Sequence, residues 1–199
     1  TFQVKPGECV AIAGKNGCGK STLMQIMAGI LKPDGGELCY FGKKAAYKSS
    51  TFRRFCGYVP QENPLMEELT VQDNLKLWGG SHNANTKELV AQFQLEDLLQ
   101  TEVSKLSGGM KRRLSIACAL VENPPFLLMD EPTTALDLYY KESIHQWMKT
   151  YQQKNGIILM TTHDESEIRN ADRCLFMDEG RVQELDAEDI LQKFAGMSE

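Results

Sequence analysis

The chain has 199 residues, 42% of them hydrophobic, and this length suits one sizeable domain or a core with a smaller inserted subdomain. Its formal net charge of -5 at pH 7 argues against a nucleic-acid partner, because nucleic acids attract basic surfaces. Six cysteines without metal-ligand spacing indicate a reduced, cytosolic protein, and no apolar run reaches the about 18 residues of a membrane span, so any membrane role must come through a partner.

The amino end is predicted to contain two strands. Phe2 and Val4 alternate with polar residues as in a strand, and the apolar run 9–13 follows as the second. Directly after it comes Gly14-Lys15-Asn16-Gly17-Cys18-Gly19-Lys20-Ser21-Thr22, which matches G-x-x-x-x-G-K-[ST], the phosphate-binding P-loop. Strand, glycine loop and helical pattern occur in the order that a P-loop requires.

The residue types of this loop suit a polyphosphate. Its glycines can take the positive φ angles that turn successive backbone N–H groups toward one point, where the helix dipole adds positive potential. Lys20 would reach the β and γ phosphates, and the Ser21 hydroxyl would ligate Mg²⁺. The predicted nucleotide-binding residues of the loop are Asn16, Gly17, Cys18, Gly19, Lys20, Ser21 and Thr22. A glycine turn without function is the alternative that the flanking patterns disfavour.

Beyond the P-loop helix, which we expect to end at Gly29, the sequence indicates a small β part. Strands are predicted at 37–41 and 56–60, and the second runs into Gln61. A basic stretch between them is interpreted as a solvated loop face: Lys43, Lys44, Lys48, Arg53 and Arg54.

From residue 62 to residue 105 the pattern changes to short helices. Thr70 and Thr86 are predicted to begin two of them as caps, with a polar loop at 81–85 between. We therefore expect a helical subdomain, 62–105, inserted into a single domain whose core is 1–61 and 106–199.

Leu106-Ser107-Gly108-Gly109-Met110 is predicted to begin the next helix with Ser107 as its cap. Two glycines in a first helical turn cost about 1 kcal/mol each relative to Ala, which is unfavourable for structure alone. The segment is better explained as a second anion site, formed by a hydroxyl and exposed N–H groups at a helix start. One chain would then carry more phosphate sites than one ATP needs.

The apolar run 126–130 predicts a strand buried on both faces that ends in Asp130 and Glu131. Asp130 would hold Mg²⁺ through water, and Glu131 would polarise the water that attacks the γ phosphate. An acidic pair that merely opens a turn before Pro132 is the alternative, and it becomes the weaker one only in combination with Lys20.

The remaining elements complete an alternating pattern. Helices are predicted at 138–153 and 164–170, and strands at 157–161, 174–178 and 181–185, with a hairpin turn between the last two. The fold class is therefore α/β: a mainly parallel sheet flanked by helices, a small antiparallel β part and the inserted helices.

With these motifs in this order, the chain resembles the nucleotide-binding domain of an ATP-binding cassette (ABC) ATPase, a P-loop NTPase. The matching motifs are Walker A 14–22, Q-loop Gln61, signature 106–110, Walker B 126–131, D-loop 135–137 and switch His163. The resemblance implies ATP and Mg²⁺ as cofactors. It also implies a head-to-tail dimer with a second such domain, identical or not, in which Ser107, Gly108 and Gly109 of one copy cover ATP on the Walker A of the other.

Roles for further residues follow from the same resemblance. Glu131, His163 and Gln61 would be catalytic, with His163 at the γ phosphate and Gln61 sensing Mg²⁺ and the attacking water. The metal would be held by Ser21, Gln61 and Asp130, and Asp137 would reach across the dimer interface. Taken singly, Gln61 reads as a surface residue, His163 as a satisfied histidine and Asp137 as a helix cap.

Two features depart from the family pattern. Met110 stands where the family usually has Gln, which we expect to alter local packing and leave the phosphate chemistry intact. The family also places a strand and an adenine-stacking aromatic before the P-loop strand. Because Phe2 is better explained as core, we expect a truncated or atypical domain with weakened adenine recognition.

The resemblance implies the ATP-hydrolysing subunit of a transporter, which acts on a separate transmembrane permease and lies on the cytoplasmic face of the membrane. A soluble ABC ATPase of the iron–sulfur assembly type is the alternative. A P-loop kinase or GTPase would leave Ser107 unexplained, and the chain lacks an Asn-Lys-x-Asp guanine reader.

Overall fold

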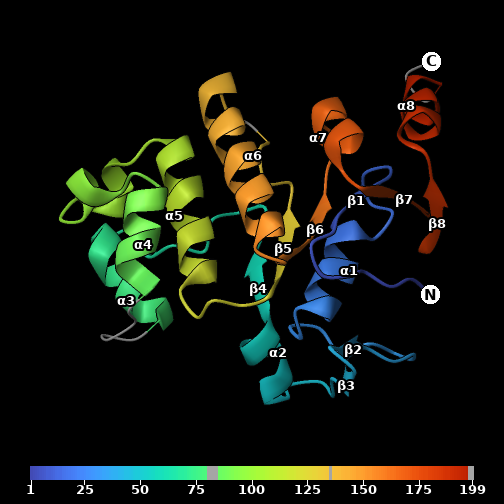
Figure 1. Ribbon diagram of the computed structural model, residues 1–199, viewed down its shortest axis with the longest axis horizontal. Coiled ribbons are helices and arrows are strands. Elements are labelled where there is room, and N and C mark those ends of the chain that lie inside the picture. The colour runs from blue at the N-terminus through green and yellow to red at the C-terminus, as the bar shows by residue number, and fades with distance from the viewer. Residues whose placement is uncertain (80–84, 135, 197–199) are drawn as a thin grey trace.

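The computed structural model describes residues 1–79, 85–134 and 136–196, and within them a six-stranded sheet forms the centre of the fold (Figure 1). Its strands are β1 (Cys9–Ala13), β4 (Cys56–Val59), β5 (Phe126–Asp130), β6 (Ile157–Thr161), β7 (Arg173–Asp178) and β8 (Arg181–Leu185). Their spatial order is β4-β5-β6-β1-β7-β8, and every neighbouring pair is parallel except the antiparallel hairpin β7-β8. The predicted α/β fold with a mainly parallel sheet is confirmed.

The central strands are apolar throughout because helices cover both faces of the sheet. All residues of β1, β5 and β6 are buried. Alternate residues of β1 face opposite layers, since Ala11 joins one hydrophobic cluster whereas Val10 and Ile12 join the other. The carboxyl ends of these strands meet at one edge, where Asp130 pairs in register with Thr161.

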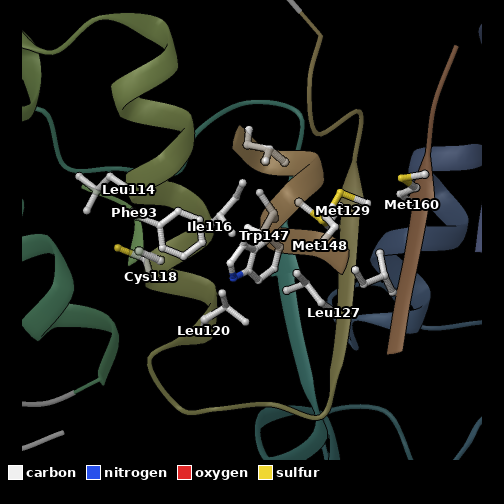
Figure 2. Packing of buried hydrophobic residues seen from close by; sticks show 14 of the residues in the cluster. Phe93, Leu114, Ile116, Cys118, Leu120, Leu127, Met129, Trp147, Met148 and Met160 are labelled. Carbon is white, nitrogen blue, oxygen red and sulfur yellow. The ribbon is translucent and has the colours of Figure 1, made fainter. Parts of the chain in front are cut away.

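The two layers of helices are unequal. Helix α1 (Lys20–Met27) packs Met24 and Met27 against the cluster that contains Val10 and Ile12. The other cluster is covered by α5 (Gly108–Leu120), α6 (Leu138–Gln153), α7 (Glu165–Asn170) and α8 (Ala187–Ala195). Figure 2 shows Trp147 of α6 beside Phe93 in this second cluster. The sequence reasoning did not predict α8.

The segment between α1 and β4 is more regular than predicted. The strand expected at 37–41 is only β2 (Cys39–Tyr40), which pairs antiparallel with β3 (Lys43–Lys44), and α2 (Ser50–Phe55) follows. The basic stretch was interpreted as a solvated loop face, and Lys43, Lys44, Lys48 and Arg54 are indeed exposed. It is not all loop, however: its first two lysines form β3, and Arg53 and Arg54 belong to α2. Short elements of this kind carry too few residues to show a periodicity.

The strand predicted around Phe2 and Val4 does not form, because residues 1–5 take no regular secondary structure. Both side chains are half-buried and pack against the cluster on the α1 side of the sheet. This packing agrees with the interpretation of Phe2 as a core residue.

The helices predicted between β4 and α5 are present, although the first of them begins only at residue 71. They are α3 (Val71–Gly79), α4 (Asn85–Gln92) and the 3-10 turns η1 (Glu96–Leu98) and η2 (Val103–Lys105). Thr70 caps α3 through its Oγ1, which accepts from the backbone N–H of Asp73 at 3.1 Å. The expected cap Thr86 lies inside α4, and residues 81–84 of the predicted loop fall outside the described residues. No helix in the described ranges is long and apolar enough to cross a membrane.

Candidate functional site

The P-loop residues lie where β1 ends and α1 begins, as the sequence predicted. Gly17 and Gly19 have backbone φ angles of 78° and 108°, which residues with a side chain rarely adopt. These angles let the loop fold back on itself. Lys20 is buried, and its Nζ donates to the backbone oxygens of Gly14 at 2.7 Å and Lys15 at 3.0 Å. A cation is thereby fixed inside the loop, where it suits a polyphosphate.

The backbone at Glu131 is strained, and Thr161 holds it. Glu131 follows the last residue of β5 and has a φ of 48°, an unfavourable value for a residue with a side chain. Its backbone N–H donates to both the carbonyl oxygen and Oγ1 of Thr161, each at 3.1 Å. Thr161 Oγ1 also donates to Oδ1 of the buried Asp130 at 2.5 Å. The two acids are therefore fixed by one side chain on the neighbouring strand.

Three segments bring their side chains together at the carboxylate of Glu131. His163 Nε2 lies 3.1 Å from Oε1, and Gln61 Nε2 and Thr134 Oγ1 donate to Oε2 at 3.4 Å and 2.9 Å. A cavity of about 460 Å³ opens at this point, and it is lined by Asn16, Gly17, Gly19, Lys20, Ser21, Thr22, Gln61, Glu131 and His163. Nine of the predicted site residues, distant in sequence, thus surround one cavity.

Electrostatics favours the neutral form of His163. Partial burial is the main factor that lowers its pKa, and the nearby Lys20 cation lowers it further. Glu131 opposes both effects through its charge and its hydrogen bond. Because the net shift is downward, the neutral imidazole is favoured at neutral pH, and it can share a hydrogen bond with the Glu131 carboxylate.

The residues around the cavity offer chemical groups that suit ATP and Mg²⁺. A buried Lys20 and a loop of backbone N–H groups suit phosphate oxygens. Ser21, Gln61 and Asp130 offer hydroxyl, amide and carboxylate oxygens, which are the donors that Mg²⁺ prefers. Asp130 is buried and is not among the residues that line the cavity, so it would act on a metal from behind, in keeping with a contact through water.

Cys18 is the loop residue whose side chain faces away from the cavity. It is partly buried against the cluster on the α1 side of the sheet, and a Cβ placed at Gly14 would lie 3.0 Å from its Sγ. Any contribution of Cys18 to phosphate binding would come from its backbone N–H.

The signature residues do not join this cavity. Ser107 caps α5 by accepting from the N–H of Met110 at 3.3 Å, and Ser107 and Gly108 are exposed. Gly109 is buried instead and packs so closely on Tyr140 that a Cβ there would lie 2.4 Å from the ring. Among the described residues, the cavity lining includes none of Ser107, Gly108, Gly109 and Asp137.

Asp137 has the local role that its position predicts. It caps α6 by accepting from the N–H of Tyr140 at 3.1 Å and is itself exposed. The next two residues, Leu138 and Tyr139, expose 81% and 66% of their surface, which is unusual for large apolar side chains. Ala135 of the predicted D-loop lies outside the described residues.

Sequence reasoning missed two groups that hold the site together. Arg112 of α5 is buried and donates to the backbone oxygens of Pro60, which precedes Gln61, and of Glu131. Glu167 of α7, also buried, accepts from Oγ1 of Thr133 at 2.8 Å and from Oγ1 of Thr162, so it joins the turn after Glu131 to the turn before His163. The only signal for Arg112 in the sequence is that it belongs to a run of charged residues inside a helix, and that this helix must pack against neighbours on two of its sides.

Comparison with known proteins gives consistent matches. A family model described as ABC transporter matches residues 1–134. The Nod factor export ATP-binding protein I of Rhizobium etli is 35% identical over 206 residues, which cover 98% of this chain and 65% of that protein. The first curated relatives are matched over 55% to 65% of their length, so the chain spans less than two thirds of them.

Solved structures agree on the fold. An ATP-binding cassette, solved as a dimer in a post-hydrolysis state with ADP and Pi, matches 92% of this chain and 88% of its own, with 30% identity and a TM-score of 0.82. The ATP-binding subunit of an ABC transporter matches 98% of this chain and 85% of its own, with 32% identity and a TM-score of 0.83.

Proposed function

The chain belongs to the ABC transporter family, and on that premise we propose that it binds and hydrolyses ATP to power a transporter. The observation that carries the proposal is the single cavity in which Lys20, Gln61, Glu131 and His163 converge. A buried lysine alone suits phosphate binding, whereas a carboxylate, an amide and an imidazole beside it also suit activation of water.

Each side chain has a proposed role in hydrolysis. Lys20 and the N–H groups of the P-loop bind the phosphates, and Ser21, Gln61 and Asp130 hold Mg²⁺. When bound, Mg²⁺ neutralises phosphate charge and orients the phosphate for in-line attack. Glu131 accepts a proton from water, while neutral His163 keeps that carboxylate in place and contacts the γ phosphate.

We propose further that the site is completed by a second copy or a related domain. Ser107 and Gly108 are exposed at the start of a helix, away from the cavity of their own chain, and would bind ATP held by the partner. Leu138 and Tyr139, highly exposed beside Asp137, would be covered in the same interface. The structurally matched cassette solved as a dimer supports this arrangement.

The transmembrane partner would dock on the helical segment, which we propose as a subdomain of residues 62–105 within a core of 1–61 and 106–199. Met66, Leu77 and Trp78 expose 51%, 57% and 46% of their surface there. The backbone N–H and carbonyl of Met66 bond the side chain of Asn74 at 2.9 and 3.0 Å, so this residue is presented rigidly. Relatives named for Nod factor export favour an exporter over the iron–sulfur alternative, with this chain on the inner face of the membrane.

Light scattering after size-exclusion chromatography tests the proposal. The Glu131→Gln variant should dimerise with Mg-ATP and stay monomeric without it, and its ATP hydrolysis should fall about 100-fold or more relative to the parent. The parent rate should rise faster than linearly with protein concentration, because each site needs two chains. A parent chain that neither binds nor hydrolyses ATP would refute the proposal.

Two control variants separate the two halves of the composite site. Lys20→Met should abolish nucleotide binding by the monomer. Ser107→Arg should preserve monomer binding and abolish dimerisation, since Ser107 lies outside its own cavity. If Ser107→Arg left dimerisation unchanged, the signature segment would have no role in trans. Co-purification with a polytopic membrane protein would test the permease partner.

A further inference from the structure

Arg112 makes an unusual set of contacts for a buried cation. Its guanidinium donates to four backbone oxygens: Nε to Pro132 at 2.9 Å, Nη1 to Pro60 at 2.5 Å, and Nη2 to Asp130 at 2.9 Å and Glu131 at 3.1 Å. The side chain is only 4% exposed. None of the four acceptors is a carboxylate, so the role of this side chain is to fix backbone positions.

The acceptors belong to two segments that each contribute a side chain to the lining of the cavity. Pro60 directly precedes Gln61, and the other three oxygens belong to the turn that carries Glu131. The amide of Gln61 and the carboxylate of Glu131 meet at 3.4 Å. The guanidinium thus connects the backbones from which these two side chains extend.

The geometry requires arginine specifically. A guanidinium is a planar fork with five N–H donors, four of which are used here in fixed directions. An ammonium group has three donors at one point and cannot reach Pro60 and Pro132 together. Burial lowers the pKa of Arg112 to about 10, so the side chain still carries its charge at neutral pH.

We infer that Arg112 is a positioning residue for ATP hydrolysis: it holds the Gln61 loop and the Glu131 turn at the separation that catalysis needs. This inference depends on the proposed ATPase function. Arg112 is not among the residues that line the cavity, and none of its four hydrogen bonds reaches the P-loop, so it sets kcat and leaves the affinity for ATP unchanged.

The chain offers a matched control in the next residue. Arg113 is 5% exposed on the same helix, and its Nη1 donates to the backbone oxygen of Phe93 at 2.9 Å and to the side chain of Gln94, away from the cavity. We would compare Arg112→Lys with Arg113→Lys in melting temperature, dissociation constant for a fluorescent ATP analogue, and steady-state kcat. Arg112→Lys should lower kcat about 10- to 100-fold with the dissociation constant within about twofold, whereas Arg113→Lys should keep both.

A second variant guards against a purely structural effect. In Arg112→Ala, millimolar guanidinium should restore part of kcat by occupying the vacated space, and it should not rescue Lys20→Met. Equal kcat for the two lysine variants, a matching loss of ATP affinity, or failure of both Arg112 variants to fold would each overturn the inference. Loss of all activity in the parent chain would instead refute the proposed function, so the two failures are distinguishable.

Discussion

The imidazole of His163 and the carboxylate of Glu131 face each other in the lining of the P-loop cavity, with Nε2 3.1 Å from Oε1. The pair is not a simple ion pair. Burial and Lys20 lower the pKa of His163, and the attraction of Glu131 only partly offsets them. The neutral form of the imidazole is therefore favoured at neutral pH.

The first prediction concerns the pKa of His163, measured by NMR titration of its ring. We expect a value below the ordinary histidine pKa of about 6.5. The Glu131→Gln variant should lower it further, because the charge and hydrogen bond that raise it are lost. Lys20→Met should raise it.

The lowered pKa of His163 also determines how the stability of the fold changes with pH. A histidine whose pKa is lowered in the folded state binds fewer protons than it does when unfolded. Its contribution to stability is complete above the pKa of unfolded histidine and is lost as the pH falls below it. A titration of His163 above the ordinary value would contradict this account.

The second prediction separates two adjacent glycines of the signature segment. Gly109→Ala should lower the free energy of unfolding by about 1–3 kcal/mol, because its Cβ would lie 2.4 Å from the Tyr140 ring. Gly108→Ala should change it by less than about 1 kcal/mol, since nothing lies within 4 Å. Urea unfolding measures both values. Combining Gly109→Ala with Tyr140→Ala should recover part of the loss, and a purely additive result would exclude the clash.

The third prediction tests the hydroxyl of Thr161, which joins Asp130 to the N–H of Glu131. Thr161→Val keeps the shape of the buried side chain but removes both hydrogen bonds, and it should cost about 1–3 kcal/mol of stability. Thr161→Ser keeps the hydroxyl and loses one methyl group, at a cost of about 1 kcal/mol. Chemical denaturation of the two variants compares the stability lost with the hydroxyl and the stability lost with the methyl group. If both variants lost the same stability, the two hydrogen bonds of the hydroxyl would contribute no more to the stability of the fold than the methyl group of Thr161.

Long elements with strong periodicity were predictable from sequence. The bounds expected for α6 and β6, 138–153 and 157–161, agree with the structure, because apolar residues at helical spacing and an uninterrupted apolar strand each leave one interpretation. The nucleotide cavity was predictable for another reason. Its side chains lie at strand ends that must meet at one edge of a parallel sheet, so order along the chain determines proximity.

The parts that failed depend on contacts distant in sequence. The sequence reasoning gave no role to Arg112 and Arg113, which are both buried because α5 packs between the sheet and the helical segment. Gly109 was explained only by phosphate binding, whereas the Tyr140 ring from another helix also requires it. No local pattern in the chain reports either neighbour.

The last prediction concerns how the helical segment is attached to the core. Trp147 of α6 is 6% exposed, and it lies beside Phe93 (Figure 2), with the two ring centroids 5.3 Å apart. The ring centroid of Tyr151 lies 5.4 Å from that of Trp147. Since Phe93 follows α4, Trp147 packs the helical segment against the core. Trp147→Ala should cost about 3–5 kcal/mol, measured by denaturant unfolding, whereas Trp78→Ala, at an exposed position, should cost less than about 1 kcal/mol. Similar losses at the two tryptophans would mean that the helical segment is held by other contacts.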